Sequence, residues 1–581
     1  MHVSIFAPFP RFNCAFMAQS PGLGGASTPP RRIVSQRSLS KDLHPDSAIV
    51  ITTSLSYRTD MNLPHRQPGL WLRPLLLAAL IATTCVTARS AEPRPKSLFP
   101  GATPVCSLEK LATLSLPDTT IESATVDPTN GMVRVTAIVT HPPSGDRVKV
   151  WIGLPLTNWN GRFQGTGGGG FLGGHPDSLR GPVSRGFAAG ATDTGHEGGS
   201  GSFALDRNGR QNWQGIIDNS YLGIHEMTVV GKAITQAFFG RAPHYSYFVG
   251  GSTGGRQGLM EAQRFPDDYD GILSACPAIN WHRFVPASLW PEVVMLSRSN
   301  FVSKAKLDAA TAAAVAACDG NDGVKDGVID DPFGCTYDPR RLIGTKIGDE
   351  TFTETDAEVV AKIWQGPRRQ DGRFMWYGLE RGADMSPYAG TGGSPLQGRP
   401  FSIALEYWVY YLAQDALWDW STLSYAGFEL LWTKSVEQFG AVIGTDNPDL
   451  TRFRDRGGKV IIYHGLADQL IPAAGSIDYL QRVQQQLGGA QKAAAFVRLF
   501  VVPGVDHGFR GAGPAPTGLQ EAIIRWVEDG RAPERLIAEK REGSGKVIRT
   551  RPLFPYPQVA KYKGRGSTDE AANFESATPH K

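Results

Sequence analysis

A serine enclosed by glycines is the feature that most constrains this chain. The segment Gly250-Gly251-Ser252-Thr253-Gly254 closes the strand-like run YSYFVG and opens the helix-like stretch RQGLMEAQRF. At a strand–turn–helix junction of this kind, a serine hydroxyl projects above the edge of a sheet, and small neighbours tolerate the strained turn. The pattern predicts that Ser252 is a nucleophile. The alternative is a ligand-binding glycine turn with an ordinary serine.

Short apolar strands alternate with amphipathic helices on both sides of a long irregular segment. The runs GGKVIIYHG at 457–465 and FVRLFVVPG at 496–504 are typical of buried strands. We therefore expect an α/β fold of the α/β-hydrolase class. The segment 281–447 is rich in Trp, Tyr, Phe, Pro and Gly, and it breaks the alternation. It is predicted to be an insertion between a first part, 92–280, and a second part, 448–581.

A serine hydroxyl needs a base, and in this fold an acid and then a histidine follow the serine along the chain. Asp468 comes directly after the strand at 457–465, and His507 comes directly after the strand at 496–504. We predict that His507 is the general base and that Asp468 orients its ring. His464 is interpreted as structural. Asp506 cannot easily reach the ring of its neighbour. A third rival, Asp478, falls in the next helix.

The oxyanion that forms during such a reaction needs two backbone donors. One is expected to be the N–H of Thr253, directly after the nucleophile. The other is expected from the glycine run GTGGGGFLGG, where Gly169 is preferred to Gly168. Glycine lets the backbone approach a substrate carbonyl closely. The alternative for this run is a flexible loop with no catalytic role.

The N-terminal ninety residues have a different character from the rest. From Met61, basic residues precede the apolar run Pro74–Val86 and a small-residue cleavage site after Ala88. This is the anatomy of a signal peptide, assigned to 61–91, and the apolar run is too short to span a bilayer. We interpret residues 1–60 as upstream sequence that precedes the true start. A membrane-anchored N-terminus is the alternative. A secreted or periplasmic location is expected.

Charge and hydropathy exclude two classes of partner. The formal net charge is +4, and no Lys/Arg block lies near aromatic residues, so nothing indicates nucleic-acid binding. Beyond the leader, no stretch is long and apolar enough for stable membrane insertion of the mature chain.

Four cysteines remain in that mature chain: Cys106, Cys276, Cys318 and Cys335. One or two disulfides are expected in an oxidising compartment. The oligomeric state stays open.

Many segments, in one order, resemble the tannase and feruloyl esterase family of α/β-hydrolases, which includes a mono(hydroxyethyl) terephthalate hydrolase. The resemblance runs from Cys106 to the C-terminus. It rests on CSLEKLATLSLPDTTI, NWNGRF, ATDTGH, PAINW, CDGNDGVKDGVIDDPFGC, DALWDW, RGGKVIIYHGLAD and RTRPLFPYPQVAKYKGRGSTDEAANF. It implies that 281–447 is a lid domain. It also implies a structural Ca²⁺ site stapled by a Cys318–Cys335 disulfide.

The acidic loop after Cys318 has the residue types that such a site needs. Calcium prefers about 6–8 oxygens from carboxylates and backbone carbonyls. The carboxylates would come from Asp319, Asp322 and Asp326, and the carbonyls from Val324 and Val328. The spacing is not that of an EF-hand. An acidic turn without metal is the alternative.

The chain departs from the family pattern at several cysteines. Gly251 and Gly508 replace a pair that joins the serine and histidine loops. Phe554 and Ser576 replace a C-terminal pair. Val133 stands where the usual partner of Cys106 is expected, so Cys106 is either free or paired with Cys276.

The resemblance implies a carboxylic ester hydrolase that acts through an acyl-enzyme on aromatic esters, either hydroxybenzoyl (galloyl) or hydroxycinnamoyl (feruloyl). Arg381 and Trp376 in the lid are candidates for substrate binding. For any single lid aromatic, a place in the core is the alternative. A terephthalate-monoester hydrolase, a non-catalytic binding protein that retains the fold, and a metal-dependent hydrolase that uses the acidic loop are the alternatives for function.

Overall fold

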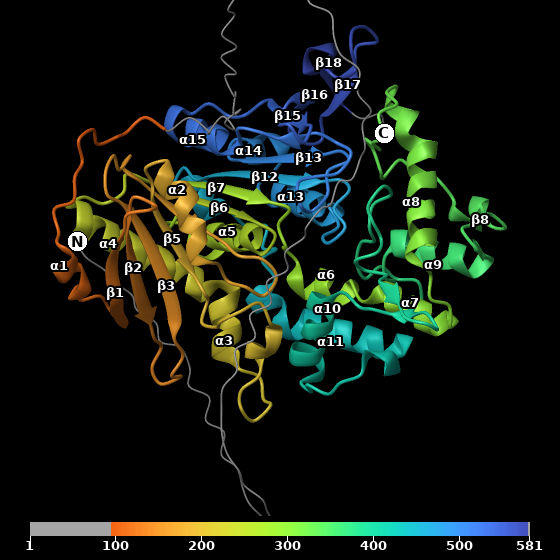
Figure 1. Cartoon of the computed structure of the whole chain (residues 1–581), viewed down its shortest axis with the longest axis horizontal. Helices are drawn as coiled ribbons and strands as arrows, with labels where there is room; N and C mark the ends of the chain where they lie inside the picture. The colour runs from red at the N-terminus through yellow and green to blue at the C-terminus, as the bar shows by residue number, and fades with distance from the viewer. Residues whose placement is uncertain (1–94, 579–581) are drawn as a thin grey trace, which may run out of the picture. The chain divides into compact units, whose positions relative to one another are not determined.

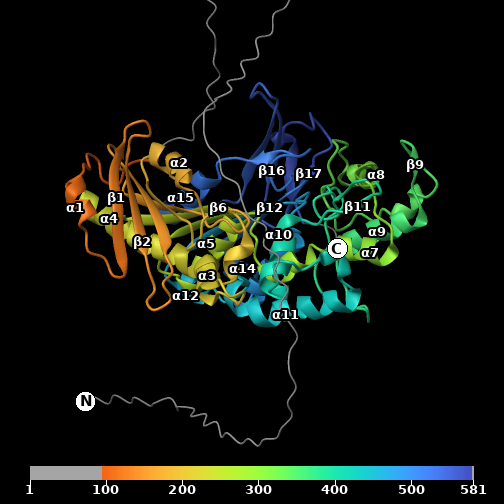
Figure 2. The same cartoon turned by 60° about the horizontal axis from the view of Figure 1, so that its bottom comes forward.

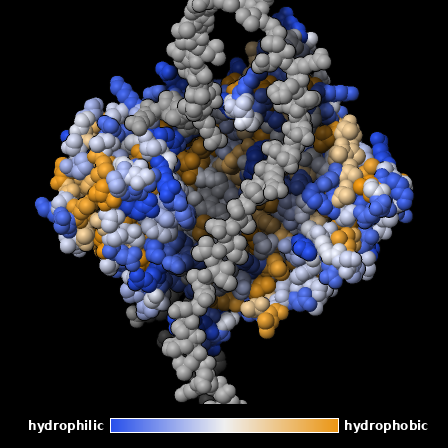
Figure 3. All heavy atoms as spheres, viewed as in Figure 1, coloured by the Kyte–Doolittle hydropathy of each residue, from blue (hydrophilic) through white to orange (hydrophobic). Residues whose placement is uncertain are grey.

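The structure is a computed structural model that describes residues 95–578 (Figures 1 and 2). The predicted upstream segment 1–60 and most of the predicted signal peptide, 61–91, therefore lie outside the described residues, as does its cleavage site. Within residues 95–578, no helix combines the length and the apolar character needed to cross a membrane. On the face seen in Figure 3, hydrophilic side chains predominate at the outer edges and apolar side chains form separate patches.

Nine strands form one sheet in the order β1-β2-β3-β5-β4-β6-β7-β12-β13. Neighbours are antiparallel from β1 to β5 and parallel from β5 to β13. From β2 onward this is the strand order of the α/β-hydrolase fold, as predicted. The bounds are β1 Thr119–Asp127, β2 Met132–Val139, β3 Val148–Pro155, β4 Arg162–Thr166, β5 Ala188–Thr192, β6 Tyr245–Gly251, β7 Gly271–Ala275, β12 Lys459–Gly465 and β13 Val497–Val502.

Helices cover both faces of the sheet, which explains why its central strands are apolar on both sides. Helices α4, α5 and α13 bury apolar side chains in the core of one face. On the other face, α15 packs against β6, β7, β12 and β13, and α2 packs beside β5. The bounds are α2 Arg180–Ser184, α4 Gly223–Phe239, α5 Thr253–Arg264, α13 Ala474–Gln486 and α15 Leu519–Asp529.

The insertion lies between β7 and β12 and has its own aromatic core, which includes Trp290, Trp408 and Phe428. Phe171 and Ile216 from the first part belong to the same core, so the insertion packs on the sheet domain. Its helices occupy one side of the molecule in Figure 1. They are α6 Trp281–Ala287, α7 Trp290–Arg298, α8 Lys304–Cys318, α9 Glu354–Gln365, α10 Ser402–Glu406 and α11 Tyr425–Ile443.

Smaller elements complete the described chain. Strands β14 to β16 form a three-stranded sheet near the C-terminus, and β17 pairs with β18. Their bounds are β14 Ala515–Pro516, β15 Leu536–Arg541, β16 Val547–Leu553, β17 Val559–Tyr562 and β18 Phe574–Ala577. The short hairpins are β8 Lys346–Ile347, β9 Glu350–Thr351, β10 Thr391–Gly392 and β11 Gln397–Gly398, and the short helices are α1 Leu108–Ala112, α3 Trp213–Ile217, α12 Thr451–Asp455 and α14 Ala490–Ala494.

Cysteine pairing is decided by the fold. Cys318 and Cys335 form a disulfide, as the resemblance implied. Cys106 and Cys276 are both free. Cys106 lies just before α1, whereas Cys276 is buried directly after β7, so the alternative of a bond between them is wrong.

Candidate active site

Ser252 occupies a sharp turn between β6 and α5. Its φ of 59° and ψ of −122° lie in a region that non-glycine residues rarely adopt, which is the expected strain of a nucleophile elbow. A side chain at Gly250 would come within 2.5 Å of the backbone of Gly254, so the turn requires glycine there. The backbone N–H of Ser252 donates to Ala275 O at 2.9 Å, which ties the turn to the end of β7.

The structure brings the three predicted residues together. Because β6, β12 and β13 are parallel in one sheet, the loops after them meet at the same edge. His507 Nε2 lies 3.1 Å from Ser252 Oγ, and His507 Nδ1 lies 2.9 Å from Asp468 Oδ2. The sequence separations of these contacts are 255 and 39 residues, so only the tertiary fold creates them.

Asp468 is completely buried and held on several sides. Its Oδ1 accepts hydrogen bonds from the backbone N–H groups of Leu470 and Ile471 at 2.8 and 2.9 Å. His464 Nε2 lies 3.3 Å from Oδ2. Burial alone would raise the pKa of Asp468, but hydrogen bonds from His464 and His507 hold that pKa well below its usual range. Asp468 is therefore a carboxylate with a fixed orientation.

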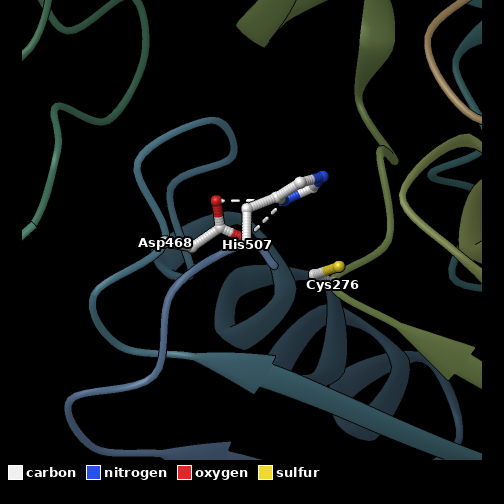
Figure 4. A group of neighbouring side chains, drawn as sticks. All are labelled: Cys276, Asp468 and His507. Carbon is white, nitrogen blue, oxygen red and sulfur yellow. Dashed lines mark hydrogen bonds and ion pairs between the residues drawn. The ribbon is translucent and has the colours of Figure 1, made fainter. Parts of the chain in front are cut away.

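His507 is anchored by its backbone as well as by its ring, because its N–H donates to Gln469 Oε1 at 3.0 Å. Burial lowers the pKa of His507, but hydrogen bonds with Asp468 and then with Cys276 outweigh burial and raise that pKa to about 10. Figure 4 shows the Cys276 thiol beside the His507–Asp468 pair. Burial raises the pKa of this thiol, and the contact with His507 acts in the opposite direction.

An aromatic contact occupies the place of the absent disulfide. Phe509 has a positive φ of 58°, and its ring approaches within 3.4 Å of the position where a Cβ on Gly251 would lie. The same ring packs against Tyr463, at 5.4 Å between centroids. The loop that carries His507 is therefore held near the serine turn by packing rather than by a covalent bond.

The two predicted oxyanion donors lie on adjacent segments of the chain. Thr253 is the first residue of α5, where helix geometry leaves the N–H free. Gly169 pairs with Leu172 in an isolated antiparallel bridge, and nothing lies within 4 Å of a Cβ built on it. Gly168 differs, because its N–H donates to Gln257 Oε1 at 3.1 Å. The Thr253 hydroxyl donates to Gly170 O at 2.6 Å and joins the two backbone segments.

The two predicted substrate contacts lie in different places. Arg381 Nε donates to Tyr337 O at 3.3 Å, and its guanidinium lies 4.9 Å from the ring centre of Trp364. Trp376 is buried against Gly475, near the start of α13. The described structure shows no contact between either side chain and Ser252, Asp468 or His507, and their role in binding stays a prediction.

Glu380, next to Arg381, is the lid residue that approaches the acid of the site. It is buried, and its Oε1 accepts from Ala474 N at 2.9 Å. Burial, with the nearby negative charge of Asp468 as a smaller cause, raises the pKa of Glu380 to about 8. The insertion therefore brings a buried carboxyl with a raised pKa into the electrostatic surroundings of Asp468.

The acidic loop is compact, and its carboxylates have different partners. Asp319 Oδ1 accepts from the backbone N–H groups of Asp326, Gly327 and Val328 at 3.0–3.2 Å, which closes the loop on itself. Asp326 Oδ2 lies 2.6 Å from Arg551 Nη2. Burial, followed by a hydrogen bond with Asp322, raises the pKa of Asp330 well above its usual value.

Several oxygens of this loop lack a partner. The carbonyls of Val324 and Val328 accept no hydrogen bond from the described chain. Asp322 and Asp330 face each other as two adjacent acids. Such a set fits a hard cation, which would take the two carbonyls and separate the acids.

Sequence reasoning missed several residues that shape the site. Gln469 and Phe509 adjoin predicted residues, and Asp330 continues the four-residue spacing of Asp322 and Asp326, so a local signal existed for these three. Nothing local signalled Cys276 or Glu380, because Cys276 approaches His507 only through strand pairing and Glu380 interacts with Asp468 only through packing of the insertion.

Comparisons with known proteins agree with this geometry. The family model described as "Tannase and feruloyl esterase" matches residues 133–577. A protein of Arthroderma benhamiae named "Probable feruloyl esterase" is 39% identical over 480 residues, which cover 80% of this chain and 87% of that protein. The "Mono(2-hydroxyethyl) terephthalate hydrolase" of Piscinibacter sakaiensis is 30% identical, covering 74% of this chain and 82% of that protein.

Solved structures resemble the fold over a similar span. "Feruloyl esterase B" from Aspergillus oryzae has a TM-score of 0.71 at 26% identity, covering 80% of this chain and 98% of that chain. "Tannin acyl hydrolase" from Aspergillus niger has a TM-score of 0.72 at 25% identity, covering 81% and 96%. The chain therefore belongs to the tannase and feruloyl esterase family and is a carboxylic ester hydrolase of that type.

Proposed function

We propose that this carboxylic ester hydrolase is a secreted serine esterase that cleaves aromatic esters through an acyl-enzyme. One observation carries the proposal: the unbroken chain of hydrogen bonds from Ser252 Oγ through His507 to the buried Asp468 carboxylate, at the end of a strained elbow. Further support comes from the buried and oriented carboxylate of Asp468, which matches the role of the acid in such a triad.

The reaction has two steps. Ser252 Oγ attacks the ester carbonyl carbon while His507 Nε2 takes the serine proton, and the N–H groups of Thr253 and Gly169 stabilise the oxyanion. The tetrahedral intermediate then collapses and expels the alcohol, which receives that proton from His507. An acyl-serine remains. Water then attacks the acyl carbon, again giving a proton to His507. The acid leaves as the proton returns to Ser252 Oγ.

We expect a hydroxybenzoyl (galloyl) or hydroxycinnamoyl (feruloyl) group as the acyl part. Support comes from relatives that are named feruloyl esterases and from the tannin acyl hydrolase fold. The aromatic lid core supplies rings that an aromatic acyl group could contact. A terephthalate monoester is the alternative acyl group, because one relative is named a mono(2-hydroxyethyl) terephthalate hydrolase.

A structural Ca²⁺ in the acidic loop is part of the proposal. The carboxylates of Asp319, Asp322 and Asp326 and the carbonyls of Val324 and Val328 would hold it, with the added carboxylate of Asp330. When bound, the cation supplies positive charge that lets adjacent carboxyls of this loop stay ionised. The loop lies in the lid, and the residues of the reaction above do not belong to it.

Export is proposed from two observations. Residues 61–91 have signal-peptide character, and Cys318 and Cys335 are oxidised to a disulfide, which persists in oxidising compartments. Periplasmic and extracellular destinations share these features. Fractionation of cells that express the chain with and without residues 61–91 tests this part, because deletion should retain the protein in the cytoplasm.

The decisive experiment compares wild type with Ser252→Ala on methyl gallate, methyl ferulate, mono(hydroxyethyl) terephthalate and a p-nitrophenyl alkanoate. Ser297→Ala is the matched control, since that hydroxyl donates only to the backbone carbonyl of Val294. Turnover should fall by about 10⁶-fold in Ser252→Ala and be unchanged in the control.

The ranking of these substrates decides which acyl group the enzyme prefers. Preference for the gallate or ferulate ester supports the aromatic proposal, and preference for the free para-carboxylate of the terephthalate ester replaces it. Cleavage of the alkanoate alone would overturn the aromatic acyl group but keep the serine mechanism. Turnover that survives Ser252→Ala would overturn the mechanism.

A further inference from the structure

One histidine outside the active site is surrounded by three carboxylates. His141 follows β2, Asp146 lies in the loop before β3, and Asp218 begins the π-helical turn Asp218–Leu222. His141 Nδ1 lies 2.5 Å from Asp146 Oδ2 and 3.8 Å from Asp218 Oδ1. On the opposite side of the ring, His141 Nε2 contacts the carboxylate of Glu226 on α4. Ligand atoms of His141, Asp146 and Asp218 all lie within 4.8 Å of one another.

The negative charge of this group is not balanced by protein cations. Among residues 95–578, no lysine or arginine forms an ion pair with Asp146, Asp218 or Glu226. Asp218 is completely buried, its Oδ1 accepts from the neutral amide of Gln214 at 2.8 Å, and its Oδ2 has no partner. Glu226 Oε2 is also buried without a partner. A buried polar oxygen without a hydrogen-bond partner is costly, so these two atoms need a ligand or another explanation.

A second His–carboxylate group in the same part of the chain shows the contrast. His225, Glu261 and Asp268 also bring ligand atoms within 4.8 Å of one another. There, Lys232 supplies a cation, because its ammonium donates to the backbone carbonyl of Asp268 and packs on the ring of Tyr269. The group around His141 has the same residue types without the lysine. The two groups therefore differ in the nearby lysine, although both oxygens of Glu261 in the His225 group are also buried without a partner.

We infer that His141 Nδ1, Asp146 and Asp218 form a binding site for a divalent transition-metal ion such as Zn²⁺. One imidazole nitrogen and two carboxylates are ligands that zinc accepts at about 2.0–2.2 Å, which places tetrahedral ligands roughly 3.3 Å apart. The 2.5 Å and 3.8 Å separations bracket that value. Asp146 needs to move outward by about 1 Å, and its position in a loop between two strands permits this.

Glu226 has a different role in the same site. It contacts Nε2, the ring nitrogen that would not bind the metal. A metal-bound histidine commonly donates its other N–H to a carboxylate, which fixes the tautomer and strengthens the ligand. Gln214, whose amide contacts both Asp218 and His141, occupies the space next to the site and can present its carbonyl oxygen instead. The site lacks a fourth protein nitrogen or sulfur, so water would complete the coordination.

The site is connected to the active site by one short segment. Asn219 follows Asp218 and donates to Phe171 O at 3.1 Å and to Thr194 Oγ1 at 3.1 Å. Phe171 directly follows the glycine loop that contains Gly169. A metal at Asp218 would therefore stiffen the turn that supports the predicted oxyanion loop. Its role is structural, and it touches no reacting atom.

The test is Zn²⁺ binding by the full chain in competition with a chromophoric chelator, at saturating Ca²⁺ so that the acidic loop is occupied. Bound Co²⁺ is then observed by its visible absorption as an independent signal. The variants are His141→Gln, Asp146→Asn and Glu226→Gln. His175→Gln is the matched control, since His175 lies 3.6 Å from an aspartate on the exposed surface. Cys276→Ala tests the rival group of Cys276, Asp468 and His507.

We expect one Zn²⁺ per chain, with affinity at least about 100-fold weaker in His141→Gln and Asp146→Asn and about 10–100-fold weaker in Glu226→Gln. The two controls should bind as wild type does. Asp146 is in a loop, so that variant decides the question if the buried ones unfold. Unchanged binding in Asp146→Asn, no binding by wild type, or loss of the ion only in Cys276→Ala would overturn the inference.

Discussion

Two regions of the molecule stabilise their charged groups in opposite ways. One is the edge of the sheet that carries Ser252, Asp468 and His507, and the other is the acidic loop of the lid. At the sheet edge, Asp468 is buried, yet backbone N–H groups and two histidines supply donors to its carboxylate. In the acidic loop, Asp322 and Asp330 face each other, and a disulfide closes the chain around them. The first region is organised by its own strands, and the second depends on a covalent bond and on a proposed cation.

The two regions differ because more ordered strand ends surround Asp468 than surround the acidic loop. Three parallel strands end at the triad, so their loops start from fixed positions and can point donors at one carboxylate. The acidic loop follows a single helix, α8, and is held from outside by Arg549 and Arg551 of β16, which contact Asp326, and by the disulfide. Preorganisation therefore comes from the sheet in one region and from cross-links in the other.

Removing the charge of the triad acid should have the largest effect. Asp468→Asn keeps the size of the side chain but stabilises the wrong tautomer of His507, so kcat should fall by about 10⁴-fold. Steady-state kinetics on the best ester measures this, and an unchanged melting temperature shows that the fold is intact. A fall in kcat of less than tenfold would mean that catalysis does not depend on the Asp468 carboxylate.

Opening the lid disulfide should change stability and leave the chemistry intact. The bond joins residues separated by 17 positions, and a loop of this size contributes about 3 kcal/mol. Chemical denaturation of Cys318→Ser/Cys335→Ser should show that loss, while kcat of the folded protein stays near wild type. Cys106→Ser is the control. A large fall in kcat would contradict the separation of the two regions.

Calcium removal should act on the same region. If the loop binds Ca²⁺, an ion at 100 times its dissociation constant stabilises the folded chain by about 2.7 kcal/mol. Chelation should lower the melting temperature, and added Ca²⁺ should restore it. Asp322→Asn should be insensitive to the chelator. If the melting temperature of wild type does not respond to Ca²⁺, the loop is held only by the disulfide and by the contacts of Asp319 and Asp326.

Phe509 tests whether packing replaces the absent disulfide at the triad. Phe509→Ala removes the ring that fills the space beside Gly251, so His507 should lose alignment with Ser252. We expect about a tenfold fall in kcat, less than the 10²-fold cost of a 1 Å misplacement. Phe333→Ala, an exposed lid phenylalanine, is the control. Equal activity in both variants would show that the backbone of the sheet edge suffices.

The smallest expected effect concerns pH. His507 must be neutral to accept a proton, and a pKa of about 10 places the rising limb of kcat/KM on the alkaline side of an ordinary histidine. Cys276 contributes to raising that pKa, so Cys276→Ala should move the limb to lower pH. A pH profile of kcat/KM measures the shift, with Cys106→Ala as control. A move to higher pH would contradict the contact.

The sequence predicts those site residues whose role follows from neighbours in the sequence. The elbow at Ser252, the strand ends before Asp468 and His507, and the Cys318–Cys335 bond could be predicted, because glycine spacing, apolar runs and family motifs lie in short segments of sequence. Sequence reasoning did not reach Asp330, although the four-residue spacing signalled it. Nor did it reach Glu380 or Cys276, which approach the triad from elements distant in sequence.

What the sequence by itself determined is the alternation of strands and helices, the nucleophile turn and the family, since each depends on contiguous residues. Only the tertiary structure decided that Cys106 and Cys276 stay apart, that Phe509 fills the space beside Gly251, and that His141 gathers three carboxylates without a lysine. The physical reason is that charge balance and packing depend on which distant segments meet, and side chains many residues apart come together only when the sheet and its helices have formed.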